Sequence, residues 1–265
     1  MLKNNLFLAV LLVSGSLFAQ PASFPQGRLP YDNPFAFGQD LSFVLQAERR
    51  GGVWYDTDGM QKSPWQIFRD HGYNWGRLMI CNEPSRLGQT LDYVIEGAKK
   101  LKENDIHFAL DFMMSDGWSN PMTQPTPSSL RDMTHKQRVD AFYGYVHGVI
   151  ATLRDNGVQP EMVQVGNETN GALCGEKIWF NIQYLMQAGA RATREIFPEA
   201  LVAVHFANPE SGAYADYAKK LAYYDVDYDV FASSYYPYWH GTLENLRGVL
   251  GDVAETYGKK VMVME

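Results

Sequence analysis

Positive charge is scarce in this 265-residue sequence, which has 23 lysine and arginine residues against 30 aspartate and glutamate residues and a net charge of −7. Binding to phosphate groups needs clustered lysine and arginine, so the composition argues against a nucleic acid or an anionic membrane surface as partner. Long hydrophobic runs are also missing. The apolar run at residues 6–13 is too short to span a bilayer comfortably, and no other segment is long enough.

Cysteine and clusters of metal ligands are equally sparse. The two cysteines, Cys81 and Cys174, could pair in an exported protein, but disulfide geometry is demanding and the strands that precede them are not neighbours. The sequence leaves both outcomes open. The six histidines show no pair at ligand spacing on one element, so we expect no bound metal and no cofactor.

The N-terminus has the pattern of a secretory signal peptide. Residues 1–19 combine a basic start, a short apolar core and a small residue at Ala19. A buried N-terminal helix is the alternative. No cysteine follows the apolar core, which argues against a lipid anchor. We expect residues 20–265 to form a single domain, because no linker or shift in composition marks a second one. The signal-peptide pattern predicts that this domain is secreted or periplasmic, and we expect it to be a monomer.

Apolar periodicity predicts alternating strands and helices along the rest of the chain. The strands are apolar on both faces, which is typical of a parallel sheet covered by helices. Gly189 lies on the buried face of one helix, where it would allow close packing on the sheet. The predicted strands are residues 35–41, 74–81, 106–112, 163–166, 201–206, 230–234 and 260–264, and the predicted helices are residues 64–69, 91–101, 139–153, 178–196 and 243–253.

This alternation predicts an α/β protein with the (β/α)8 TIM-barrel fold. A barrel is favoured over an open sheet because no Gly-x-Gly-x-x-Gly fingerprint opens any predicted helix. Only seven strands can be assigned, whereas a closed barrel has eight. We therefore interpret the sequence as a barrel truncated after its seventh strand.

Two glutamates follow predicted strands and are the strongest catalytic candidates. Glu168 ends the segment Val163-Gln164-Val165-Gly166-Asn167-Glu168, and Glu265 follows the apolar run at residues 261–264, 97 residues later. Three repeats of about 32 residues separate them, so both should emerge at the C-terminal face of the barrel, where enzymes of this fold have their active sites. Two carboxylates across one barrel mouth are the minimum needed to cleave a glycosidic bond. The alternative is a helix-capping or salt-bridging Glu168 and a frayed Glu265.

Polar and aromatic residues at other predicted strand ends are candidates for substrate contact. Arg77 could support the nucleophile through hydrogen bonds or form a surface ion pair. Asn167 could bind a substrate hydroxyl, and Asp111 is interpreted as an orienting carboxylate. The aromatic residues could stack on sugars or pack in the core, and the two histidines could line the cleft or simply bond at strand ends. These last candidates are Trp118, Tyr236, Tyr238, Trp239, His205 and His240.

Longer motifs strengthen this interpretation. They include Tyr55-Asp56-Thr57-Asp58-Gly59, Asn82-Glu83-Pro84, Ser115-Asp116-Gly117-Trp118-Ser119-Asn120-Pro121, Gln164-Val165-Gly166-Asn167-Glu168, His205-Phe206-Ala207-Asn208 and Ser234-Tyr235-Tyr236-Pro237-Tyr238-Trp239-His240-Gly241. From Phe37 onwards the chain resembles glycoside hydrolase family 53, the endo-β-1,4-galactanases of clan A. The resemblance implies Glu168 as acid/base, Glu265 as nucleophile and Asn167 as its partner, and it adds Asp116 and Asn208 as substrate-binding candidates. It further implies retaining hydrolysis of the β-1,4-galactan side chains of pectin.

Several positions depart from the family pattern. Met113 stands where the family has histidine, Met79 and Cys81 stand where it usually has arginine and tryptophan, and Asn120 replaces an aspartate. These changes leave the chemistry intact but open the identity of the glycan. A calcium site is frequent in a late loop of bacterial members, a region absent from this sequence. A clan relative acting on mannan or xylan, or a glycan-binding barrel without turnover, remain the alternatives.

Overall fold

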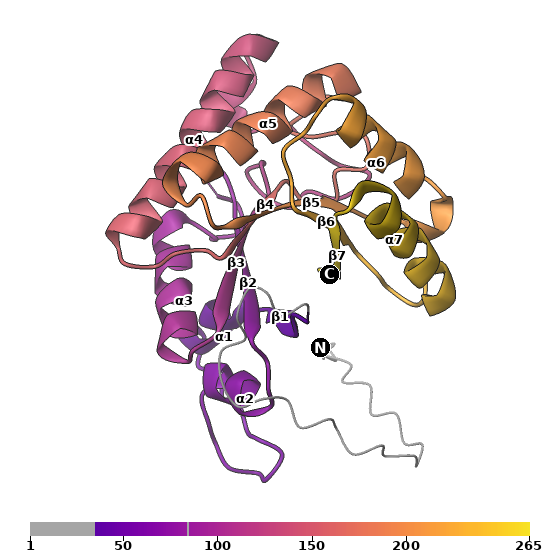
Figure 1. Cartoon of the computed structure of the whole chain (residues 1–265). Helices are drawn as coiled ribbons and strands as arrows, with labels where there is room; N and C mark the ends of the chain where they lie inside the picture. The colour runs from indigo at the N-terminus through magenta and orange to yellow at the C-terminus, as the bar shows by residue number, and fades with distance from the viewer. Residues whose placement is uncertain (1–34, 84) are drawn as a thin grey trace, which may run out of the picture.

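The computed structural model describes residues 35–83 and 85–265, in which seven parallel strands form one curled sheet in the order β1-β2-β3-β4-β5-β6-β7. Figure 1 shows the sheet curling around a concave side, with the helices on the convex side. The strands are β1 (Gly38–Asp40), β2 (Trp75–Ile80), β3 (His107–Phe112), β4 (Met162–Val165), β5 (Leu201–Phe206), β6 (Val230–Ser233) and β7 (Lys260–Val263). The α/β prediction is confirmed, and β1 and β7 form the two edges of this sheet.

The helices of the described chain follow the strands in the repeating pattern of this fold. They are α1 (Val44–Arg49), α2 (Pro64–Asp70), α3 (Leu91–Glu103), α4 (His135–Asp155), α5 (Trp179–Ile196), α6 (Tyr214–Tyr223) and α7 (Leu243–Tyr257), with short 3₁₀ turns η1 (Ser128–Leu130) and η2 (Pro209–Ser211). None of them is long and apolar enough to cross a membrane. The predicted signal peptide, residues 1–19, lies outside the described residues and stays a prediction.

Local sequence signals account for several helix starts. The Thr134 side chain accepts a hydrogen bond from the backbone of Gln137, whose side chain bonds back to Thr134, forming a capping box at the start of α4. Thr90 and Thr242 cap α3 and α7 in the same position. Periodicity did not predict α1 or α6, because α1 has only six residues and the buried residues of α6 are spread thinly among tyrosines and lysines.

Close packing joins the helices to the convex face of the sheet. Gly189 of α5 behaves as predicted: a Cβ added there would lie 2.6 Å from a methyl group of Val165 on β4. The two cysteines belong to this buried interior and do not pair, since Cys81 and Cys174 are both free and buried. Burial raises the pKa of each thiol to about 12, so both thiols are neutral.

Candidate active site

The alternation of strand residues separates an apolar face from a polar one. On β2, Leu78 packs in the main core beneath the helices, whereas the neighbouring Arg77 points into the concave side. Asp111 on β3 and Gln164 on β4 lie opposite each other in the sheet register, and the amide of Gln164 donates to Asp111 Oδ1 at 2.7 Å. The result is a layer of buried polar side chains near the C-terminal ends of the strands.

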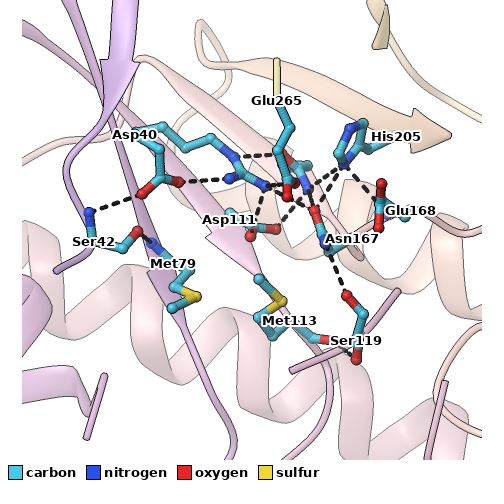
Figure 2. A network of polar contacts seen from close by, with 12 residues as sticks. Asp40, Ser42, Met79, Asp111, Met113, Ser119, Asn167, Glu168, His205 and Glu265 are labelled. Atoms are coloured by element: carbon cyan, nitrogen blue, oxygen red, sulfur yellow. Dashed lines mark hydrogen bonds and ion pairs between the residues drawn. The ribbon is translucent and has the colours of Figure 1, made fainter. Parts of the chain in front are cut away.

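Arg77 is the centre of this layer. Its guanidinium donates to Asp40 Oδ2 at 2.6 Å, to Asp111 Oδ2 at 3.0 Å and to Gln164 Oε1 at 3.0 Å. One of its nitrogens, Nη2, also donates to Asn167 Oδ1 at 2.8 Å and lies 3.5 Å from Glu265 Oε2. Figure 2 shows Asp40, Asp111, Asn167 and Glu265 joined by dashed contacts into one network. Arg77 is buried, so the surface ion pair considered for it is not what the structure shows, and support of Glu265 stays a prediction.

The charges around Arg77 shift the protonation of its neighbours. Burial raises the pKa of Asp111 to about 7, and the negative charges of Glu265 and Asp40 act in the same direction, while Arg77 opposes them. The three surrounding carboxylates hold the pKa of Arg77 above its usual value despite its burial. Asp111 thus accepts hydrogen bonds from both Arg77 and Gln164 within the sheet, and the orienting role stays a prediction.

The loop after β4 presents Glu168 in a constrained conformation. Gly166 has φ 86°, and a Cβ there would collide with Leu173 and Thr169. Glu168 itself has φ 47°, in the left-handed region that side chains other than glycine rarely adopt. Hydrogen bonds hold the loop against β5, because the backbone N–H of Thr169 donates to the carbonyl of His205 at 2.7 Å. The side chain of Asn170 both donates to and accepts from the backbone of Ala207.

The Glu168 carboxyl group lies in a largely desolvated position, with 6% of the residue exposed. Burial raises its pKa to about 7, and the negative charge of Glu265 adds to the rise. A hydrogen bond from Ser234 Oγ to Glu168 Oε1, 2.7 Å long, and the charge of Arg77 work in the opposite direction. A carboxyl group in this state holds its proton near neutral pH and can act as a general acid.

Glu265 has a different environment. Its side chain faces the Arg77 cation and accepts a hydrogen bond from the Tyr236 hydroxyl, with Tyr236 Oη 3.0 Å from Glu265 Oε1. Its backbone carbonyl accepts from the N–H of Tyr235 at 2.7 Å, which ties the end of β7 to the loop after β6. A cation and a hydroxyl donor stabilise negative charge, as a nucleophilic carboxylate requires. The negative charge of Glu265 also raises the pKa of the Tyr236 hydroxyl.

A cavity of about 520 Å³ opens beside these groups. Its lining includes Asp40, Arg77, Tyr236 and Glu265 on the polar side and the indole of Trp118 on the aromatic side. Trp118 is 42% exposed, so one ring face remains available to a ligand. Trp239 is 71% exposed and meets the ring of Tyr236 edge-on at 5.7 Å, while Tyr238 is 81% exposed. None of these three residues is buried in the core, and sugar stacking stays a prediction for them.

The remaining predicted site residues are Asp116, Asn208, His240 and His205, and each has hydrogen-bond partners of its own. The carboxylate of Asp116 accepts from the backbone N–H of Ser128 and so shapes its own loop. Asn208 accepts from Asn170 behind Glu168, and His240 accepts from the backbone N–H of Tyr236 through Nδ1. His205 is fully buried and bonded through both ring nitrogens. Of the two roles considered for the histidines, the structure supports strand-end hydrogen bonding.

Three residues of the site were not predicted from the sequence. Asp40 ends β1, Gln164 interrupts the apolar β4, and Ser234 follows β6. A polar residue at each of these positions was the available signal. Gln164 carried the clearest one, because an amide within a buried strand needs buried partners. In the described chain, no group of three or more histidine, cysteine, aspartate or glutamate side chains is arranged to hold a metal ion.

Three of the four positions that depart from the family pattern lie together, and Asn120 is not among them. Met79, Cys81 and Met113 form a buried apolar cluster of their own, against which Leu87 packs. Figure 2 shows Met79 and Met113 beneath the polar layer, with the backbone of Met79 bonded to Ser42. Met79, Cys81 and Met113 therefore pack against one another in the same cluster.

Comparisons with known proteins agree with this geometry. Residues 36–265 match the model of glycosyl hydrolase family 53. The endo-β-1,4-galactanase of Bacillus subtilis is 39% identical over 240 residues, which are 87% of this chain and 56% of that protein. The arabinogalactan endo-β-1,4-galactanase of Cellvibrio japonicus is 30% identical over 250 residues, 88% of this chain and 66% of that protein. This chain thus spans little more than half to two thirds of the length of these relatives.

A solved structure gives the same result for the fold. The catalytic domain of an Ignisphaera aggregans family 53 protein superimposes with a TM-score of 0.82 at 28% identity, covering 89% of this chain and 68% of that one. The strand order, the matched family model and the superimposed solved structure all point to one conclusion. This chain belongs to glycosyl hydrolase family 53.

Proposed function

We propose that the protein is an endo-acting glycosidase that hydrolyses β-1,4-galactan with retention of anomeric configuration, using Glu168 as acid/base and Glu265 as nucleophile. The observation that carries this proposal is the contrast between the two carboxyl groups. The pKa of Glu168 is raised to about 7 by burial, whereas Glu265 is held between the Arg77 cation and the Tyr236 hydroxyl. Carboxyl groups in opposed environments divide into an acid and a nucleophile.

The reaction proceeds in two displacements. Glu265 attacks the anomeric carbon while Glu168 gives its proton to the departing glycosidic oxygen, which leaves a covalent glycosyl–Glu265 ester and an ionised Glu168. Glu168 then takes a proton from water as that water attacks the anomeric carbon, and Glu265 departs as a carboxylate. Arg77 and Tyr236 compensate the charge of Glu265 when it is free, and Asn167 and Asp111 hold Arg77 in place.

Galactan is the substrate favoured by the names of the relatives, two of which are galactanases. A polysaccharide also suits Trp118, which lines the cavity, and the exposed Trp239, which packs against the cavity residue Tyr236, since ring faces of indole stack on pyranoses. Mannan and xylan are the alternative substrates, and glycan binding without turnover is the alternative activity. Export through residues 1–19 is part of this proposal, because a polymer of this kind is met outside the cell.

The test is release of reducing ends from purified galactan, mannan and xylan by the wild type, Glu168→Gln, Glu265→Gln and the exposed control Glu199→Gln. We expect galactan to be cleaved, each active-site variant to lose on the order of 10³-fold or more in kcat/KM, and the control to match the wild type. The wild-type kcat/KM should fall above about pH 7 as Glu168 loses its proton. Cleavage of xylan or mannan in preference would reassign the substrate, and equal turnover by Glu168→Gln would refute the catalytic assignment.

A further inference from the structure

A closed ring of hydrogen bonds links the backbone of Glu168 to its own carboxyl group. The N–H of Glu168 lies 3.3 Å from His205 Nδ1, His205 Nε2 lies 3.0 Å from Ser234 Oγ, and Ser234 Oγ lies 2.7 Å from Glu168 Oε1. His205 and Ser234 are fully buried. Figure 2 shows the imidazole of His205 beside Glu168. The ring depends on which nitrogen of His205 carries its proton.

Burial and the nearby Arg77 charge hold the pKa of His205 well below its usual value, so the imidazole is neutral and has one N–H. The surrounding groups decide its place. Within the described chain, the N–H of Glu168 has His205 Nδ1 as its one hydrogen-bond acceptor. A proton on Nδ1 would leave this buried N–H unpaired, which is costly.

Two other side chains, Asn167 and Gln164, also lie close to His205 Nδ1. Asn167 Oδ1 lies 2.9 Å from Nδ1 but already accepts from Arg77 Nη2 at 2.8 Å, with Gln164 Nε2 also 3.2 Å away. Gln164 Nε2 in turn lies 3.1 Å from Nδ1 as a donor. With the proton on Nε2, the N–H of Glu168 and the amide of Gln164 both have Nδ1 as an acceptor, and Asn167 Oδ1 keeps Arg77 Nη2 as its donor. The cost is the 2.9 Å approach of two acceptors, Asn167 Oδ1 and Nδ1. His205 Nε2–H then donates to Ser234 Oγ.

This direction fixes the hydroxyl of Ser234. Because Oγ accepts from His205, its own hydrogen points to the remaining partner, Glu168 Oε1. We propose that Ser234 is a positioning residue that donates to Glu168 Oε1 and thereby leaves Oε2 as the oxygen that carries the catalytic proton. A proton on Oε1 would place two hydrogens between oxygens only 2.7 Å apart, so the acid form of Glu168 is protonated on Oε2. The proposal rests on Glu168 being the acid/base.

Groups from several other elements also face Glu168 and bear on its titration. They are Arg77 of β2, Asp111 of β3, Tyr214 of α6, Tyr236 after β6 and Glu265 after β7. Arg77 favours the ionised form and Glu265 opposes it. Ser234 differs from all of them because it bonds directly to the carboxyl group and carries no charge. Its removal takes away the hydrogen bonds to Glu168 and His205 and leaves the charges in place.

The kinetic test compares Ser234→Ala with Ser233→Ala, a neighbouring buried serine whose hydroxyl bonds to Tyr214 and not to Glu168. The lost hydrogen bond stabilised the carboxylate, so Ser234→Ala should raise the pKa of Glu168 and move the alkaline limb of kcat/KM upward by about one pH unit. Ser234→Thr keeps the hydroxyl and should restore the wild-type limb. Coincident profiles for Ser234→Ala and Ser233→Ala would overturn the proposal.

Two spectroscopic measurements test the proposal without turnover. Nitrogen-15 NMR of the histidines in the wild-type protein should show His205 protonated at Nε2 and bare at Nδ1, and protonation at Nδ1 would overturn the proposal. Carbon-13 titration of the Glu168 carboxyl group in wild type and Ser234→Ala should show the same upward shift without substrate. If the wild type cleaves none of the glycans, the proposed function fails, while these two spectra still decide the role of Ser234.

Discussion

The two faces of the curled sheet are formed by the same strands but carry different kinds of side chain. The convex face is apolar along its length, with residues such as Leu78, Leu110 and Val163 packed beneath helices. The concave face begins with a small apolar cluster that includes Ala109, Met162 and Ala203, and then changes to charged and hydrogen-bonding side chains toward the strand ends. The comparison indicates that the convex face stabilises the fold. The concave face holds the reactive groups and lowers the free energy of unfolding by doing so.

The test with the largest expected effect compares substitutions at two neighbouring residues of β2. Arg77→Met should reduce the free energy of unfolding by about 3–5 kcal/mol at pH 8, because Asp40, Asp111 and Glu265 lose their shared cation within a buried layer. Leu78→Met, on the convex face, should cost less than about 1.5 kcal/mol, because it conserves volume. Chemical denaturation of both variants measures the difference. Equal costs would mean that the two faces do not differ in the way described.

A second test asks whether the reactive face does cost stability. The pKa of Glu168 is raised from 4.5 to about 7, so the folded state keeps a proton that the unfolded chain releases earlier. The ionised side chain therefore destabilises the fold, increasingly from about pH 4.5 to pH 7 and fully above that. Glu168→Gln should raise the free energy of unfolding by about 3 kcal/mol at pH 8 and leave it nearly unchanged at pH 4.

The exposed control Glu199→Gln should show no such dependence on pH. Urea denaturation across this pH range provides the measurement for both variants. A gain for Glu168→Gln that is equally large at pH 4 would show that repacking, and not ionisation, is responsible.

The smallest test concerns packing on the convex face. Gly189→Ala should cost about 1–3 kcal/mol, because the new Cβ would lie 2.6 Å from Val165 Cγ1. Gly148→Ala on α4 has open space around the added Cβ and should instead stabilise the protein by about 0.5–1 kcal/mol, since alanine favours a helix more than glycine does. Thermal unfolding of the two variants gives opposite shifts in Tm if the interpretation is right. Parallel shifts would argue against close packing at Gly189.

Much of the fold was predictable because its signals are local. Apolar runs and three- to four-residue periodicity located all seven strands of the described sheet and the longer helices. The short α1 and the tyrosine-rich α6 lacked a strong period and were missed. The pairing of Cys81 and Cys174 was left open by the sequence, and the buried free thiols answer it.

The candidate site was predictable in its parts but not in its connections. Glu168, Glu265, Arg77 and Asp111 could be named because charged residues within or directly after apolar strands are unusual. Their partners Asp40, Gln164 and Ser234 could not be named from the sequence. The contacts that give these polar residues their roles form only when the strands lie side by side.

The sequence by itself determined the order of strands and helices, the parallel sheet and the two carboxyl groups, because periodicity and residue type act over a few neighbouring positions. Only the tertiary structure decided the protonation of Glu168. The pKa of Glu168 depends on burial, on Glu265 and on Ser234, which lies 66 residues away along the chain. Electrostatic and hydrogen-bond energies depend on distances in space, and folding alone sets those distances.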